Sequence, residues 1–131
     1  MNTNPAIPVK KFIPAIIWFF VVLTLICLPG NDLPKVDDWF HKINGDKIIH
    51  VGVFGLLAFL FFRPVSKSSF SKKEKIIYLV KIAIATSVWG ITTEFIQRFY
   101  IPARSFDLLD WLADSIGAAV AFIWGRWKMI K

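Results

Sequence analysis

The chain has 131 residues, of which 56% are hydrophobic, and its formal net charge is +7. Soluble domains are about 45–50% apolar, and a chain this short cannot bury the excess in one small core, so the composition excludes an ordinary soluble domain. The basic residues lie in short clusters between apolar runs, which is typical of topology signals and of contact with anionic lipid headgroups. We therefore expect membrane lipids as partners and no nucleic acid.

Four apolar segments predict four transmembrane helices, over about residues 12–28, 46–62, 76–99 and 108–127. A helix needs roughly 17–25 residues to cross a hydrocarbon core of about 30 Å, and all four segments are long enough. They show little polar face, and a helix that is apolar all round needs lipid around it. The first segment is long for a signal peptide and is not followed by a cleavage site, so we expect it to be retained. The sequence thus predicts one all-α domain over residues 1–131.

The connections between these segments are short. After the first helix, an apolar face predicts a short helix in the membrane interface, formed by Val36, Trp39, Phe40 and Ile43. The second helix is expected to end before Arg63 and Pro64, followed by a Ser- and Lys-rich loop over residues 63–75. Residues 98–107 are predicted to form a tight link between the third and fourth helices.

The distribution of Lys and Arg predicts the orientation. Ten of these residues lie in the N-terminal segment, the second connection and the C-terminal segment, and five lie in or beside the other two connections. Cytoplasmic segments of membrane proteins carry the excess of Lys and Arg. Both termini are therefore predicted to be cytoplasmic.

Polar residues gather near the predicted outer ends of the last three helices. Asp46 and His50 are four residues apart, and Glu94 and Gln97 are three apart. Three acids lie along one face of the fourth helix: Asp107, Asp110 and Asp114. Carboxylates at this depth must face each other, a cation or a water-filled cleft. We therefore expect one shared outer pocket, with the candidate residues Asp46, Lys47, His50, Glu94, Gln97, Arg104, Asp107, Asp110 and Asp114.

Several of these residues also have purely structural interpretations. Ion pairs that fix helix ends would account for Asp46, Lys47 and Arg104. Asp107 suits the start of a helix, where the dipole favours an acid. His50 alone would usually be a hydrogen-bonded buried histidine, and Gly117 is suited to close helix packing.

The motifs that carry these residues are DKIIH (46–50), EFIQ (94–97), PARSFD (102–107) and DWLADSIGA (110–118). In order, spacing and helical context, the chain from about residue 46 to residue 125 resembles the VanZ-like family, with Asp114 where the family usually has Asn. The resemblance implies a multi-pass protein of the bacterial cytoplasmic membrane. It also implies a link to the cell envelope and to antibiotic resistance, because the founding member is associated with low-level resistance to teicoplanin.

Three functions follow from these observations. The first is binding or modulation of an envelope amphiphile at the outer leaflet, such as a lipid-linked cell-wall precursor or a lipoglycopeptide, with Lys47 and Arg104 meeting phosphates. The second is a metal-dependent hydrolase or transferase that acts on a lipid headgroup, with the metal ligands drawn from His50, Asp46, Glu94, Asp110 and Asp114. The third is a small exporter. No cofactor other than this divalent metal is predicted. The sequence is compatible with both a monomer and a homodimer.

Overall fold

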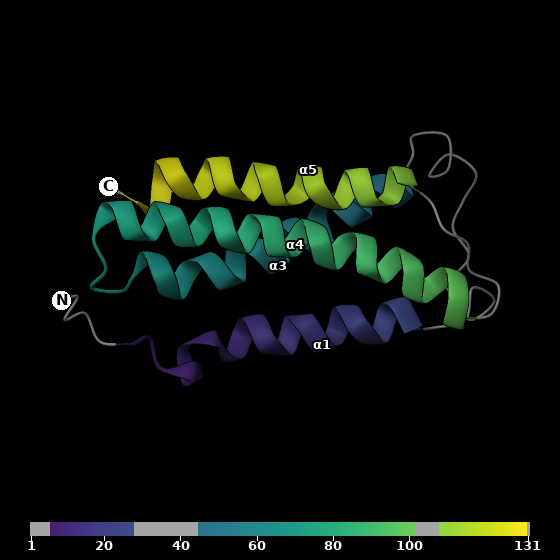
Figure 1. Ribbon diagram of the computed structural model, residues 1–131, viewed down its shortest axis with the longest axis horizontal. Coiled ribbons are helices and arrows are strands. Elements are labelled where there is room, and N and C mark those ends of the chain that lie inside the picture. The colour runs from purple at the N-terminus through teal and green to yellow at the C-terminus, as the bar shows by residue number, and fades with distance from the viewer. Residues whose placement is uncertain (1–5, 28–44, 102–107, 131) are drawn as a thin grey trace.

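The computed structural model describes residues 6–27, 45–101 and 108–130, and the regular structure in these ranges is entirely helical (Figure 1). A 3₁₀ turn, η1 (Val9–Phe12), leads into the first helix, and a π-helical segment, η3 (Gly125–Met129), follows the last. The four long helices are α1 (Ile13–Cys27), α3 (Gly45–Ser66), α4 (Lys72–Tyr100) and α5 (Leu108–Trp124). The prediction of an all-α protein with four long helices is confirmed.

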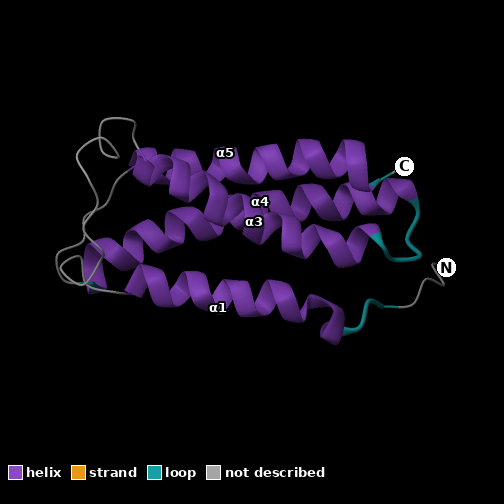
Figure 2. Cartoon of the chain, turned by 180° about the vertical axis from the view of Figure 1, so that it is seen from behind, coloured by secondary structure: helices purple, strands orange, loops and turns teal. Residues whose placement is uncertain are grey.

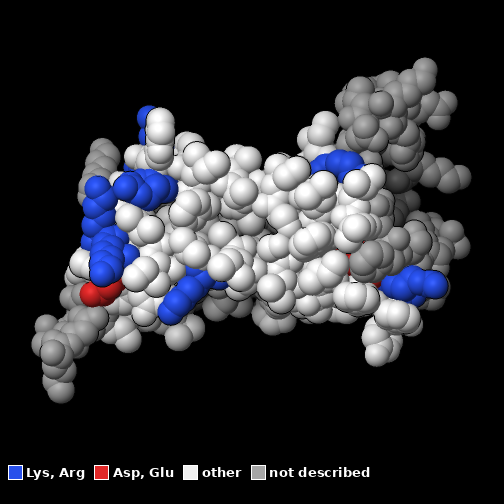
Figure 3. Space-filling view, turned by 45° about the horizontal axis from the view of Figure 1, so that its top comes forward, with Lys and Arg blue, Asp and Glu red and all other residues white. Residues whose placement is uncertain are grey.

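Each of the four helices is long and apolar enough to cross a membrane. The candidate spans are Val9–Cys27, Lys47–Ser66, Lys72–Tyr100 and Leu108–Met129. Large apolar side chains are exposed along all four, as expected for surfaces that face lipid. Lys and Arg side chains gather at one end of the molecule, while the middle of the same face is almost entirely uncharged (Figure 3).

Helices α3, α4 and α5 pack together, and α1 lies along one side of them (Figures 1 and 2). The start of α1 and the end of η3 lie at the same end of the bundle, which we call the terminal end; the opposite end is the distal end. Helices α3 and α5 approach each other closely at Gly55 and Gly117. A Cβ atom on Gly117 would overlap the carbonyl oxygen of Val51 and lie 2.9 Å from the backbone nitrogen of Gly55. Such contacts give packing energy where lipid removes the hydrophobic drive between helices.

Helix α1 is attached to the other helices through aromatic and aliphatic side chains. The indole Nε1 of Trp18 donates a hydrogen bond to the carbonyl oxygen of Val53 on α3, at 3.0 Å. The ring of Phe19 lies 4.9 Å from that of Trp89 on α4, measured between centroids. Helix α1 therefore covers α3 and α4 and contributes no residue to the polar cluster described below.

The predicted end of the second helix is wrong. Helix α3 continues past Phe62 to Ser66 and includes Pro64 in its last turn. Proline near a helix end removes only one backbone hydrogen bond, and serine hydroxyls here satisfy carbonyls of the last turn. Ser66 Oγ donates to the carbonyl oxygen of Arg63 at 2.8 Å, and Ser68 Oγ donates to that of Val65 at 2.6 Å.

The following loop is shorter than predicted because α4 begins early, at Lys72. The Ser71 side chain accepts a hydrogen bond from the backbone N–H of Glu74 at 3.2 Å. Ser71 and Glu74 have the spacing of a capping box, which starts helices. The predicted interfacial helix after α1 lies outside the described residues.

Candidate functional site

A polar cluster lies between α3, α4 and α5 toward the distal end. His50 Nδ1 lies 2.7 Å from Asp114 Oδ1, and His50 Nε2 lies 3.6 Å from Asp110 Oδ2. One potential ligand atom from each of His50, Glu94 and Asp110 lies within 4.8 Å of the other two. The ring of Phe54, one turn along α3, lies parallel to the imidazole with a centroid distance of 6.3 Å. Because three helices supply these groups, the cluster exists only in the assembled bundle.

Asp110 connects the two polar residues of α3. Its Oδ1 lies 2.5 Å from Nζ of Lys47, while its Oδ2 faces His50. Lys47 and His50 are three residues apart, so both project toward α5 from one face of α3. The side chains of Lys47 and Asp110 are 24% and 18% exposed, so this edge of the cluster is open to small polar groups.

The inner part of the cluster is fully buried. Glu94 and Asp114 are both 0% exposed, which is unusual for acids in a membrane span. Asp114 Oδ1 contacts His50, and Oδ2 has no hydrogen-bond partner among the described residues. A Cβ atom on Gly90 of α4 would lie only 2.9 Å from that Oδ2. The absence of a side chain at Gly90 therefore makes the space that Asp114 occupies.

Hydrogen bonds between α4 and α5 fix their relative position next to the cluster. The hydroxyls of Ser87 and Ser115 lie 2.7 Å apart, and the Trp111 indole donates to the carbonyl oxygen of Ser87 at 3.0 Å. Ser87 precedes Gly90 by three residues, and Ser115 follows Asp114 directly. These contacts therefore hold Asp114 against Gly90 and beneath His50.

The structure brings together five of the nine residues predicted for the pocket: Lys47, His50, Glu94, Asp110 and Asp114. Gln97 is buried, three residues beyond Glu94 on the same helix. Arg104 and Asp107 lie outside the described residues, and so does the side chain of Asp46. The interpretation of Lys47 as one half of an ion pair agrees with its contact to Asp110.

Sequence reasoning missed the residues that shape the cluster without ionisable groups. Gly90 and Ser87 line the same side of α4, and Gly55 lies on α3 opposite Gly117. A usable signal was present, because a glycine inside a transmembrane helix four residues before a carboxylate indicates a close approach by another group. That signal does not identify the group as Asp114.

An apolar groove adjoins the cluster between α3 and α5. Its volume is about 360 Å³, and it is lined by Lys47, Ile48, Val51, Leu109, Leu112, Ala113 and Ile116. Ile48 is 60% exposed and Leu112 is 50% exposed, so the groove opens on the lipid-facing surface. Lys47 belongs to both the groove and the polar cluster, which makes the two features continuous.

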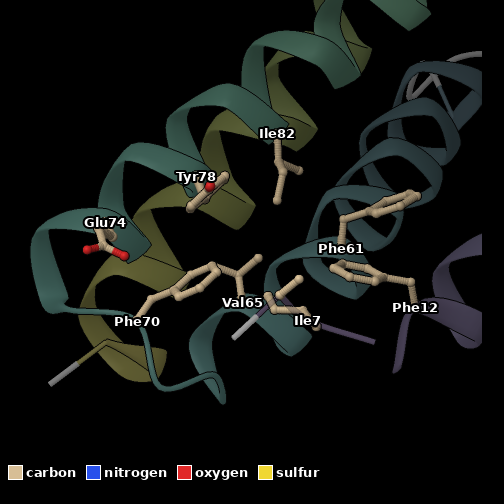
Figure 4. A pocket seen from close by; sticks show the side chains of 9 residues that line it. Ile7, Phe12, Phe61, Val65, Phe70, Glu74, Tyr78 and Ile82 are labelled. Atoms are coloured by element: carbon tan, nitrogen blue, oxygen red, sulfur yellow. The ribbon is translucent and has the colours of Figure 1, made fainter. Parts of the chain in front are cut away.

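A larger hollow of about 510 Å³ lies at the terminal end, among η1, α3 and α4 (Figure 4). Its labelled side chains are apolar apart from Glu74 and the Tyr78 hydroxyl, and the Phe12 and Phe61 rings lie 6.1 Å apart between centroids. The ends of α3 and α4 that form this hollow are opposite to the ends that carry the polar cluster. The hollow is therefore separate from the candidate site.

These features define a multi-pass α-helical membrane protein with a cluster of ionisable residues inside its bundle. The chain belongs to the VanZ/LLP1 family, whose family model matches residues 9–128. This match includes α1, so the relationship extends beyond the region from residue 46 onward. No curated protein and no solved structure matches the chain.

Proposed function

We propose that this protein binds a phosphate-bearing amphiphile of the bacterial cell envelope at the distal end of the bundle, on the outer leaflet of the cytoplasmic membrane. The observation that supports this proposal is the continuity of the apolar groove with the polar cluster through Lys47. One molecule could place its hydrocarbon chain between α3 and α5 and its headgroup beside the cluster.

The groove has the properties needed for a hydrocarbon chain. Its volume of about 360 Å³ lies in the range of roughly 300–1,000 Å³ that is usual for ligand pockets. Its lining is aliphatic apart from Lys47, and it opens sideways to lipid. A hydrocarbon chain that fits between two helices makes more van der Waals contacts there than it makes among mobile lipid tails.

The polar edge suits a phosphate or pyrophosphate headgroup. The Lys47 ammonium is a compact positive charge at the mouth of the groove, and its three donors allow it to contact Asp110 and a phosphate oxygen together. The positive-inside rule supports the outer position of this site, because the excess of Lys and Arg lies toward the terminal end. Lipid-linked cell-wall precursors and lipoglycopeptides such as teicoplanin are candidate ligands.

The test is photo-crosslinking of purified protein in nanodiscs to an isoprenoid pyrophosphate with a photoreactive chain. Leu112→Trp fills the groove, whereas Ile123→Trp adds the same bulk at an exposed site on α5 outside it. We expect Leu112→Trp to lose at least fivefold in crosslinking while Ile123→Trp matches the wild type. Equal labelling of the two variants would contradict the proposal. In cells, expression should also reduce labelling by a fluorescent glycopeptide.

A metal-dependent hydrolase or transferase is the second candidate. The proximity of His50, Glu94 and Asp110 favours it, because these residue types are ligands for catalytic metals. The assay is release of headgroup or phosphate from the same isoprenoid pyrophosphate in the presence of Mn²⁺ or Zn²⁺. Turnover by the wild type that is lost in His50→Gln would establish it, and the same slow release from both proteins would exclude it.

A further inference from the structure

We infer that His50, Glu94 and Asp110 form a binding site for a divalent cation of the Zn²⁺ or Mn²⁺ type, and that Asp114 is the positioning residue of His50. The three ligands come from α3, α4 and α5, so a bound ion would join all three helices. This inference is independent of the proposed amphiphile, because the ion and the hydrocarbon chain would occupy different places.

The distances between the ligand atoms approach those around a metal ion. Two ligands about 2.1 Å from a tetrahedral Zn²⁺ are about 3.4 Å apart, and opposite ligands of an octahedral ion are about 4.2 Å apart. His50 Nε2 and Asp110 Oδ2 are separated by 3.6 Å, and the ligand set including Glu94 lies within 4.8 Å. Small side-chain rotations are therefore enough to enclose an ion.

Asp114 sets the orientation of the imidazole. With its carboxylate as the acceptor, the 2.7 Å contact places a proton on His50 Nδ1, and in the neutral imidazole the lone pair of Nε2 then faces Asp110. Histidines that bind metals commonly donate their other ring N–H to a carboxylate, which fixes the tautomer and raises the basicity of the ligand nitrogen. Asp114 is fully buried and fitted against Gly90, so it holds this arrangement firmly.

The chemistry of the donors selects the class of ion. One imidazole nitrogen with two carboxylates suits Zn²⁺ or Mn²⁺, whereas Ca²⁺ is bound by oxygen ligands alone. Lys47 contacts Oδ1 of Asp110, so the ion would take Oδ2. Carboxylates are costly inside a membrane span, and a divalent charge would offset that penalty.

The site is tested on full-length protein in detergent, treated with EDTA and then titrated with Zn²⁺ or Mn²⁺ alone by calorimetry. We expect one ion per chain, and a loss of affinity of at least 100-fold in His50→Gln and in Asp110→Asn. Glu74→Gln removes a carboxylate at the terminal end and should bind like the wild type. Size-exclusion chromatography and circular dichroism verify that each variant is folded.

The role of Asp114 is tested by Asp114→Asn, which keeps an acceptor for Nδ1, and by Asp114→Ala, which removes it. We expect about 10-fold and up to about 100-fold weaker binding, respectively, as for other groups that orient metal ligands. The visible absorption spectrum of bound Co²⁺ should differ from that of the wild type in Asp114→Ala and match it in Asp114→Asn. Wild-type protein without a stoichiometric ion, or His50→Gln with unchanged affinity, would overturn the inference. Neither result would affect the crosslinking test.

Discussion

Asp110 holds the polar cluster together because its two oxygens face different partners on α3. Oδ1 contacts Lys47, and Oδ2 faces His50. Both ends of the Lys47–Asp110 pair are mostly buried, so removing one partner leaves the other in a region where water is scarce. The pair also links residues that are 63 positions apart in the chain, so it forms only when α3 and α5 have packed together.

Lys47→Met is predicted to reduce the free energy of unfolding by about 1–3 kcal/mol, because it leaves the Asp110 carboxylate without its ammonium partner. Asp110→Asn should show a similar loss, and the double variant should be more stable than the sum of the two losses implies. Reversible unfolding in mixed micelles measures all four proteins of the cycle. Additive losses would indicate that the pair has no energetic coupling.

Gly90→Ala is predicted to disturb the cluster without changing any charge. The new Cβ would lie 2.9 Å from Asp114 Oδ2 and 3.0 Å from its Cβ, so Asp114 must shift, and its contact with His50 would be disturbed. We expect a loss of about 1–3 kcal/mol, as for other overpacked sites. Gly52→Ala is the matched control, since nothing lies within 4 Å of a Cβ there. It should be neutral or gain up to about 1 kcal/mol in helix propensity. Thermal unfolding in detergent distinguishes the two.

The contact between α3 and α5 depends on glycine at a single level of the bundle. Gly117→Ala would drive a methyl group into the backbone of α3 at Val51 and Gly55, and backbone cannot rotate aside. At Gly125 the same substitution meets the flexible Leu79 side chain at 3.3 Å. We predict that Gly117→Ala is destabilising by at least about 3 kcal/mol and Gly125→Ala by less than about 1 kcal/mol. Equal melting temperatures for the two variants would disprove this view of the interface.

The helices could be predicted from the sequence, but their ends and rotations could not. Long apolar runs identify spans because lipid requires them, but they do not show that α3 continues through Pro64 to Ser66, where serine hydroxyls donate to the carbonyl oxygens of Arg63 and Val65. Topology alone placed His50, Glu94 and Asp110 at one depth. The choice of Asp114 as the partner of His50 depends on the rotation of α5, which the contacts at Gly90 and Gly117 set.

The charge distribution over the bundle predicts that the distal end faces outward. Tyr100, at the distal end of α4, is 79% exposed, and Ser69 is exposed in the loop at the terminal end. In a Cys27→Ser background, a membrane-impermeant thiol reagent applied to intact cells should label Tyr100→Cys and spare Ser69→Cys. Permeabilised cells provide the control, because both positions should then react. The reverse pattern would place the cluster in the cytoplasmic leaflet.

The long sequence separation within the cluster also bears on how the protein is made. His50 and its partner Asp114 are 64 residues apart, with all of α4 between them. Chains emerge from the ribosome N-terminus first, so α3 enters the translocon before its acidic counterparts on α5 have been synthesised. During that interval Lys47 and His50 must remain near water or the insertion machinery. The contacts of Lys47 and His50 with α5 therefore form only after the last helix has been made.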